Sequence, residues 1–213
     1  MARDRGDSLR RRVATREPKR RFTLICEGKN TEPEYFRALQ ATLPGALIEL
    51  IVEPAVGAPM TIAKRAATLR RKARTGDSFA QNDEIWAVFD RDEHPNFDEA
   101  VRLCANKGIS VARSNPCFEV WLILHHADFH APDGRHAVQA RLTEFHPEYA
   151  PNRGKRLDFS AILDKRPAAE MRAERQLAAR EAEGSPFGPP STTVFELTQA
   201  IARASERSSP GKK

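Results

Sequence analysis

Four short apolar runs alternate with stretches of helical periodicity over the first half of the chain, and this alternation constrains the fold most. The runs cover residues 22–26, 47–52, 84–89 and 109–112. Each is bounded by polar or turn-forming residues, as buried strands are. The stretches between them, from residue 31, at 60–74 and at 97–107, have helical spacing. Strands that alternate with helices form βαβ units, so the sequence predicts an α/β fold with a mainly parallel sheet flanked by helices.

Two of these helices carry boundary signals. In Thr31-Glu-Pro-Glu34, Thr31 can cap the helix, Pro33 suits its first turn, and Glu34 completes a capping box. The helix at 97–107 is expected to start after Asn96 and to stop at Gly108, because glycine favours the left-handed conformation common after helices.

The pattern changes after Asn115-Pro116. A strongly apolar helix is predicted over residues 117–126, and only helices are predicted beyond residue 132. Their spans are 135–145, 158–164, 168–183 and 192–204, with a loop at 184–190. We interpret residues 21–207 as one domain, with an α/β core at 21–131 and a helical C-terminal extension at 132–207.

The chain ends differ in composition from this domain. Residues 1–20 are rich in arginine and almost without apolar side chains, which predicts a disordered basic tail, and residues 208–213 are expected to be mobile. The net charge is +6 and the isoelectric point is near 9.5, a balance compatible with nucleic-acid binding. Because much of the excess charge lies in the tails, a solvated tail is the competing interpretation.

The cysteines and the lengths of the apolar runs indicate in which cellular compartment the protein is expected. Cys26, Cys104 and Cys117 are an odd and scattered set with neither a disulfide framework nor zinc-ligand spacing. No apolar run approaches the ~20 residues that a membrane span requires. We therefore expect a cytoplasmic protein with reduced thiols and no membrane contact.

Three carboxylates follow two of the predicted strands. Glu27 comes directly after the first strand, and Asp90 and Asp92 follow the third. Residues just past the carboxyl ends of parallel strands face the crevice where α/β proteins bind ligands. If the backbone stays extended, Asp90 and Asp92 leave on the same face. Mg²⁺ or Mn²⁺ favours such carboxylates, so we predict that Glu27, Asp90 and Asp92 hold a divalent cation. The alternative is that these acids cap helices or pair with Lys and Arg.

Three further features bear on chemistry. Gly28 lets the backbone approach a ligand, and Lys29 can meet a phosphate, although the segment lacks the glycines of a P-loop or dinucleotide fingerprint. Glu119 lies in a segment otherwise suited to burial, where an acid needs a partner or a metal; a helix dipole is the competing explanation. The histidines, among them His126 and His130, do not favour zinc because their helix is expected to end there.

Taken together, four stretches of the chain resemble the RloB-like family of bacterial proteins, whose core is similar to a Toprim domain. The stretches are ICEGKNTEPEYF at 25–36, VFDRD at 88–92, SNPCFEVWLILH at 114–125 and PSTTV at 190–194. In the Toprim pattern, a glutamate follows the first strand and an Asp-x-Asp pair follows a later one. Glu27, Asp90 and Asp92 match those positions, and the resemblance implies that they hold Mg²⁺ and that the glutamate acts as acid or base.

The resemblance also implies a setting for this chemistry. Related proteins occur in abortive-infection and restriction loci, often beside an ATPase partner, which implies a role in phage defence. We expect a Mg²⁺- or Mn²⁺-dependent nuclease or phosphodiesterase acting on DNA or RNA, with Glu27, Lys29 and Glu119 as catalytic candidates. The alternative is a non-catalytic regulatory or binding subunit that acts with an ATPase. Strand passage is not expected, because Tyr35 and Tyr149 are the only tyrosines and no domain carrying a tyrosine nucleophile is evident.

Overall fold

The computed structural model describes residues 20–43, 47–52, 58–75, 83–91, 94–149 and 157–208, with the backbone alone over 47–52. Nearly all of the predicted basic tail, the end of the predicted C-terminal tail and Asp92 therefore lie outside the described residues.

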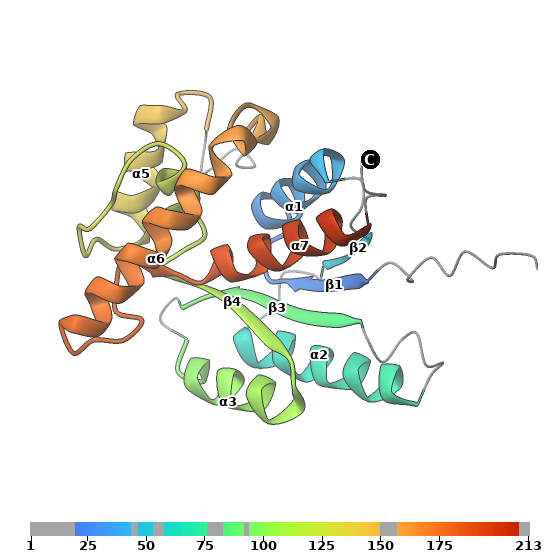
Figure 1. The fold of residues 1–213 in the computed structure, drawn as a ribbon. Coiled ribbons are helices and arrows are strands. Elements are labelled where there is room, and N and C mark those ends of the chain that lie inside the picture. The colour runs from blue at the N-terminus through green and yellow to red at the C-terminus, as the bar shows by residue number, and fades with distance from the viewer. Residues whose placement is uncertain are drawn as a thin grey trace, which may run out of the picture.

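A mixed sheet forms the centre of the molecule (Figure 1). Its strand order is β2-β1-β3-β4-β5. The strands are β1 (Arg21–Cys26), β2 (Leu47–Val52), β3 (Glu84–Asp90), β4 (Ser110–Asn115) and β5 (Ser191–Thr192). The first four are parallel and β5 is antiparallel to β4. The predicted α/β class and mainly parallel sheet are confirmed, and the arrangement is consistent with a Toprim-like core.

Helices cover both faces of this sheet. Helices α2 (Pro59–Arg74) and α3 (Phe97–Lys107) lie on one face, and α1 (Thr31–Thr42) and α7 (Val194–Ser208) lie on the other (Figure 1). The short α4 (Glu119–Leu124) joins the second group, because its apolar side chains belong to the same buried cluster as those of α1 and α7. Each face thus has its own hydrophobic core.

The alternation of side chains along β3 decides the direction of Asp90. Ile85, Ala87 and Phe89 join the core under α2 and α3, whereas Trp86 and Val88 join the core under α1 and α4. Because successive strand residues point to opposite faces, Asp90 falls on the α1 side. Arg91 lies on the opposite side, where its guanidinium carbon is 5.3 Å from the centre of the Phe97 ring.

The strand order also defines where a ligand crevice must be. From β1 the chain moves outward to β2, and from β3 it moves outward to β4 in the other direction. Such a reversal leaves a crevice at the carboxyl ends of the two central strands, which is where open α/β sheets bind ligands. In this chain β1 and β3 are those strands, so their C-terminal ends are the expected site.

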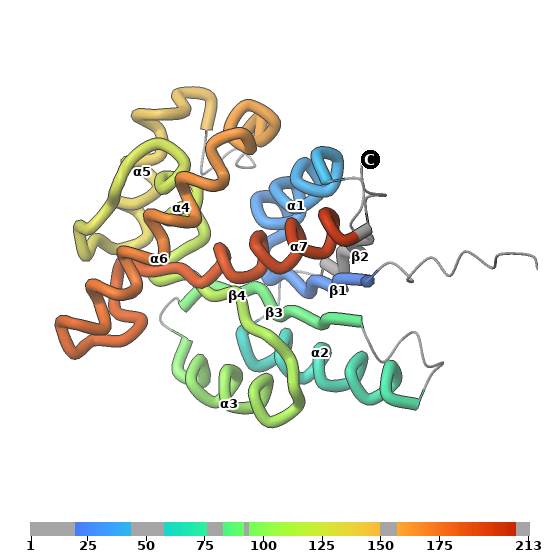
Figure 2. Tube along the Cα trace, in the orientation of Figure 1, coloured from blue at the N-terminus to red at the C-terminus, as the bar shows by residue number. Residues whose placement is uncertain are grey.

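Beyond residue 132 the described part of the chain is mainly helical, as predicted. It contains α5 (Arg135–Phe145), two 3₁₀ turns at Phe159–Ala161 and Leu163–Lys165, and α6 (Arg166–Ala182). Helix α7 then runs back over the same face of the sheet as α1 (Figure 2). No helix among the described residues has both the length and the apolar character to cross a membrane.

Four local predictions were wrong. Thr31 is the first residue of α1 and is buried, Asn30 precedes it, and no side-chain cap is made, so the capping box does not form. The apolar helix is shorter than predicted, at Glu119–Leu124. Residues 158–164 form 3₁₀ turns instead of an α-helix. Strand β5, where only helices were expected, pairs Thr192 with Ser114. The stop at Gly108 is confirmed, with φ of 66°.

Candidate functional site

Glu27 and Asp90 meet at the crevice between β1 and β3. The backbone N–H of Glu27 donates to the carbonyl of Val88 at 3.0 Å, which extends the strand pairing by one residue. The backbone N–H of Asp90 in turn donates to Glu27 Oε2 at 3.3 Å. The two carboxylates that sequence reasoning assigned to neighbouring strand ends are therefore adjacent.

Asp90 is held by an arginine from a distant part of the chain. Arg135 Nη2 donates to Asp90 Oδ2 at 3.1 Å, and the Asp90 side chain is 12% exposed. Burial raises the pKa of Asp90 well above its ordinary value, and the charges of Glu32, Glu119 and Glu27 raise it further, whereas Arg135 opposes the shift. Asp90 thus lies where a cation would relieve the repulsion between like charges.

Glu119 is a buried acid with named partners. Its side chain is on α4, and the residue is 1% exposed. Glu119 Oε1 accepts hydrogen bonds from the Tyr149 hydroxyl and, at 3.3 Å, from Gln139 Nε2. Burial and the negative charge of Glu119 both raise the pKa of Tyr149. Glu119 therefore forms part of a buried polar network beside Asp90, as a buried charge requires.

Glu32 is an acid of this site that sequence reasoning missed. It lies in the first turn of α1 and is 5% exposed. An ideal Cβ built on Gly28 would lie 2.0 Å from Glu32 Oε2, so the space beside Gly28 holds this carboxylate. The glycine predicted to admit a ligand instead admits the side chain of Glu32. The sequence analysis gave Glu32 no role, because the capping-box interpretation of this segment concerned only Thr31, Pro33 and Glu34.

Gly28→Ala should consequently destabilise the protein. The new methyl group forces a buried carboxylate to move, and overpacking of this kind costs about 1–3 kcal/mol of unfolding free energy. Urea unfolding measures the change. Gly134→Ala is the matched control, because a Cβ there meets nothing within 4 Å and its cost stays near that of a poorer helix cap, about 1 kcal/mol. Because the Cβ of the Gly28→Ala variant would overlap a buried carboxylate, we expect it to lose clearly more unfolding free energy than the Gly134 variant, and a smaller or equal loss would contradict this account.

His94 and Lys29 are two further described residues near the ends of β1 and β3. His94 Nε2 lies 3.5 Å from Glu27 Oε1, an ion pair when the histidine is protonated. Lys29 is exposed in the turn between β1 and α1. Asp92 lies outside the described residues. Within the described part of the chain, no three His, Cys, Asp or Glu side chains are placed together as metal ligands.

The cysteines near the site are buried and unreactive. Burial, and then the charge of Glu32, raise the pKa of the Cys26 thiol. Burial likewise raises the pKa of Cys117, with Glu119 and Asp90 adding to the shift. Both thiols therefore stay protonated and act as apolar side chains.

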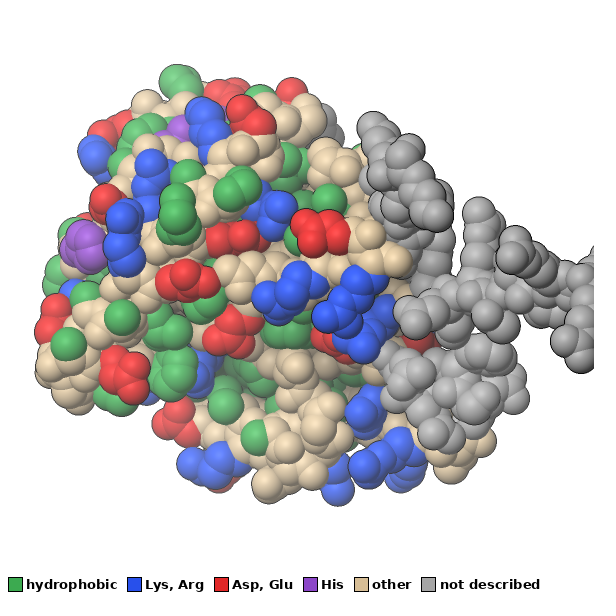
Figure 3. Space-filling model, in the orientation of Figure 1, with side chains coloured by type: hydrophobic (Ala, Val, Ile, Leu, Met, Phe, Trp, Pro, Cys, Tyr) green, Lys and Arg blue, Asp and Glu red, His purple; other side chains and the backbone are tan. Residues whose placement is uncertain are grey.

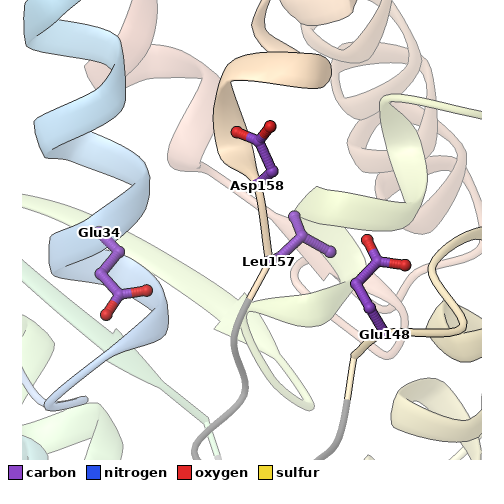
Figure 4. Close-up of a pocket in the computed structure, with 4 residues that line it drawn as sticks. All are labelled: Glu34, Glu148, Leu157 and Asp158. Carbon is purple, nitrogen blue, oxygen red and sulfur yellow. The ribbon is translucent and has the colours of Figure 1, made fainter.

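His126, His146 and Glu148 form a second polar cluster. His126 Nε2 and His146 Nε2 are 2.8 Å apart, and His146 Nδ1 lies 3.0 Å from Glu148 Oε1. Burial lowers the pKa of His126 to about 4. Glu148 also lines a shallow pocket of about 480 Å³ with Glu34, Leu157 and Asp158. The carboxylates of Glu34, Glu148 and Asp158 lie apart from one another in this pocket (Figure 4). Of the predicted site residues that the structure describes, none lines this pocket.

Basic side chains gather away from the acids. Helix α2 carries six Lys and Arg residues and no Asp or Glu, and most of these side chains are exposed. The exposed members are Lys64, Arg65, Arg71, Lys72 and Arg74. Figure 3 shows Lys and Arg side chains near the C-terminal ends of α2 and α7, on the half of the molecule where β1 begins. This surface is opposite the carboxyl ends of the strands.

Comparison with known proteins identifies the family. Neither the curated proteins nor the solved structures contain a significant match. The family profile described as RloB-like protein matches residues 22–201, a span that begins in β1 and ends in α7. Because this match covers most of the folded part, including the strand ends that carry Glu27 and Asp90, the chain belongs to the RloB-like protein family.

Proposed function

We propose that this protein is a Mg²⁺- or Mn²⁺-dependent Toprim-like nuclease or related phosphodiesterase of bacterial phage defence. The observation that carries the proposal is the meeting of Glu27 and Asp90 at the crevice between β1 and β3. Glu32 and Glu119 add negative charge there. Carboxylate oxygens are the donors that hard divalent cations prefer, so the donor set fits Mg²⁺ or Mn²⁺. The defence role rests on family membership.

Each residue has a distinct task in this proposal. Asp90 and Asp92 hold the cation, and Glu27 either joins them or transfers a proton. When bound, such a cation polarises a phosphoryl oxygen and lowers the pKa of water. Lys29 is exposed beside the acids and balances charge on the phosphate. Glu119, fixed by Tyr149 and Gln139, shapes the field at Asp90.

A nuclease assay tests the proposal directly. Purified protein is incubated with double-stranded DNA, single-stranded DNA and tRNA, with Mg²⁺, with Mn²⁺ or with EDTA. Cleavage that requires the cation and disappears in Asp90→Asn supports the proposal. Absence of any cation-dependent cleavage, together with absence of Mn²⁺ binding by calorimetry, would contradict it.

Nucleic acid is the proposed substrate class, and salt dependence tests which basic residues bind it. Deleting residues 1–19 removes seven Lys and Arg residues from the chain. If these contact phosphates, affinity for a short duplex falls and the slope of log K against log salt becomes shallower, by about 0.9 per lost contact. Fluorescence anisotropy at several salt concentrations measures both quantities.

The matched variant for this deletion changes the described basic helix instead. Replacing Arg71, Lys72 and Arg74 of α2 by Gln removes three positive charges while leaving the N-terminal residues intact. An unchanged slope after the deletion and a reduced slope in the α2 variant would assign the contacts to α2. Unchanged slopes in both would remove the support that basic charge gives to a nucleic-acid substrate.

A regulatory subunit that acts with an ATPase is the second candidate. One observation favours it: Asp90 is paired with Arg135 in the described structure, and the described acids do not form a ready three-ligand metal site. In that case the protein binds its ATPase partner without cleaving nucleic acid, and Asp90→Asn leaves partner binding unchanged.

A further inference from the structure

Arg135 joins the acid site from a position that sequence reasoning did not connect with it. It is the first residue of α5, a helix of 11 residues, and lies 45 positions after Asp90. Its Nη2 is 3.1 Å from Asp90 Oδ2. The Asp90 side chain is 12% exposed, whereas that of Arg135 is 36% exposed. Arg135 therefore reaches the buried acid from the solvent side.

The charges around Asp90 give this contact a specific meaning. Among the charged groups that act on Asp90, Glu32, Glu119 and Glu27 are acids and Arg135 is a cation. The guanidinium of Arg135 thus supplies beside Asp90 the kind of positive charge that a bound metal ion would supply. A divalent cation on Asp90 would both replace this attraction and repel the guanidinium, because like charges a few ångströms apart disfavour each other.

We propose that Arg135 is a substrate-binding residue that contacts the phosphate of the nucleic acid, and that Asp90 holds it in the metal-free protein until a divalent cation displaces it. This inference rests on the proposed function, since it concerns the same acids. Arginine suits the role, because its planar guanidinium can donate two parallel hydrogen bonds to a phosphate. The N-terminus of α5, where Arg135 lies, carries a partial positive charge and also favours an anion.

The proposal predicts coupling between two ligands. While Arg135 remains on Asp90, it is not available to phosphate, and the surrounding acids repel the anion. After the cation binds, the negative charge of the acids is reduced and Arg135 loses its ion pair with Asp90, and its partly exposed side chain can then turn toward a phosphate. Phosphate should therefore bind more tightly in the presence of the cation, and by linkage the cation should bind more tightly in the presence of phosphate.

Two titrations test this, with Mn²⁺ alone and then with thymidine 5′-monophosphate in the presence of Mn²⁺. Arg135→Gln should bind Mn²⁺ about fivefold more tightly than wild type, because the competing cation is gone. The same variant should bind the monophosphate at least ~10-fold more weakly. Electron paramagnetic resonance measures free Mn²⁺, and calorimetry measures the monophosphate. Arg135→Lys keeps the charge and should lie between wild type and Arg135→Gln in both titrations.

The control and the opposing outcomes separate this proposal from a structural role. Arg175→Gln makes the same charge change at an exposed ion pair with Asp128, and should leave both affinities near those of wild type. Weaker or unchanged Mn²⁺ binding by Arg135→Gln, or unchanged monophosphate binding, would overturn the proposal while leaving the metal-dependent function standing. If wild type itself binds no Mn²⁺, the proposed function fails, and the role of Arg135 with it. Arg135→Lys supplies the same comparisons if Arg135→Gln does not fold.

Discussion

Replacing Asp90 by Asn is expected to abolish metal-dependent cleavage while leaving the metal-free protein equally or more stable. Activity should fall roughly a thousandfold, because a metal ion contributes several kcal/mol to the transition state and depends on carboxylate charge. Stability should not fall with it, because Asn removes a buried charge that Glu32, Glu119 and Glu27 oppose. The lost ion pair with Arg135 offsets part of this gain. Thermal melts with and without Mg²⁺, beside the nuclease assay, measure both effects.

The pH dependence of this comparison follows from the direction of the pKa shift. The folded pKa of Asp90 is raised above the ordinary value of 3.8, so the folded state binds its proton more tightly than the unfolded state does. The charged carboxylate therefore penalises the fold above the raised pKa, and the penalty disappears as pH falls through it. The excess melting temperature of Asp90→Asn over wild type should be largest at neutral pH and vanish below about pH 4.

A matched variant controls for the change of net charge. Asp164→Asn removes an exposed carboxylate from the 3₁₀ turn at Leu163–Lys165, and should change neither activity nor the pH profile of stability. If Asp90→Asn unfolds the protein, its pair with Arg135 is structural. If it keeps cation-dependent cleavage, the chemistry lies elsewhere, and the regulatory-subunit hypothesis becomes the better one.

Two substitutions of Glu119 should separate its charge from its hydrogen bonds. Glu119→Ala leaves the Tyr149 hydroxyl and the Gln139 amide without their acceptor in a buried site, and also removes side-chain volume. We expect a loss of about 3 kcal/mol of unfolding free energy. Glu119→Gln keeps an oxygen that can accept from both partners and removes the buried charge, so its stability should equal or exceed that of wild type.

Activity then shows whether the charge of Glu119 serves catalysis. Urea unfolding ranks the stabilities, and the nuclease assay is performed on the folded Gln variant. A large loss of cleavage in Glu119→Gln would support a direct role for the carboxylate. Full cleavage by Glu119→Gln would mean that the charge of Glu119 has no part in catalysis and that the residue serves packing. A strongly destabilised Glu119→Gln would contradict the assignment of the network, because both hydrogen bonds can persist in it.

The sequence by itself determined the four parallel strands and the strand ends that carry the acids. The apolar runs at 22–26 and 84–89 are composed for burial, and their lengths are those of strands. Local composition therefore sufficed to predict β1 and β3. Parallel pairing then brings their carboxyl ends to one edge of the sheet. This is why Glu27 and Asp90 could be expected at the same crevice without knowledge of any contact.

Only the tertiary structure decided what surrounds those acids. Arg135 and Gln139 come from α5, and Tyr149 follows that helix, so their contacts with Asp90 and Glu119 span 20 to 45 positions and leave no local pattern. Strand β5 could not be predicted either, because its two residues, Ser191 and Thr192, are too few to show an alternation of apolar and polar side chains. Thr31 does not cap α1 because the helix begins at Thr31 itself, and Asn30 stands at the cap position. Periodicity reports which face of an element is buried, whereas the partners of a buried charge depend on how distant elements pack together.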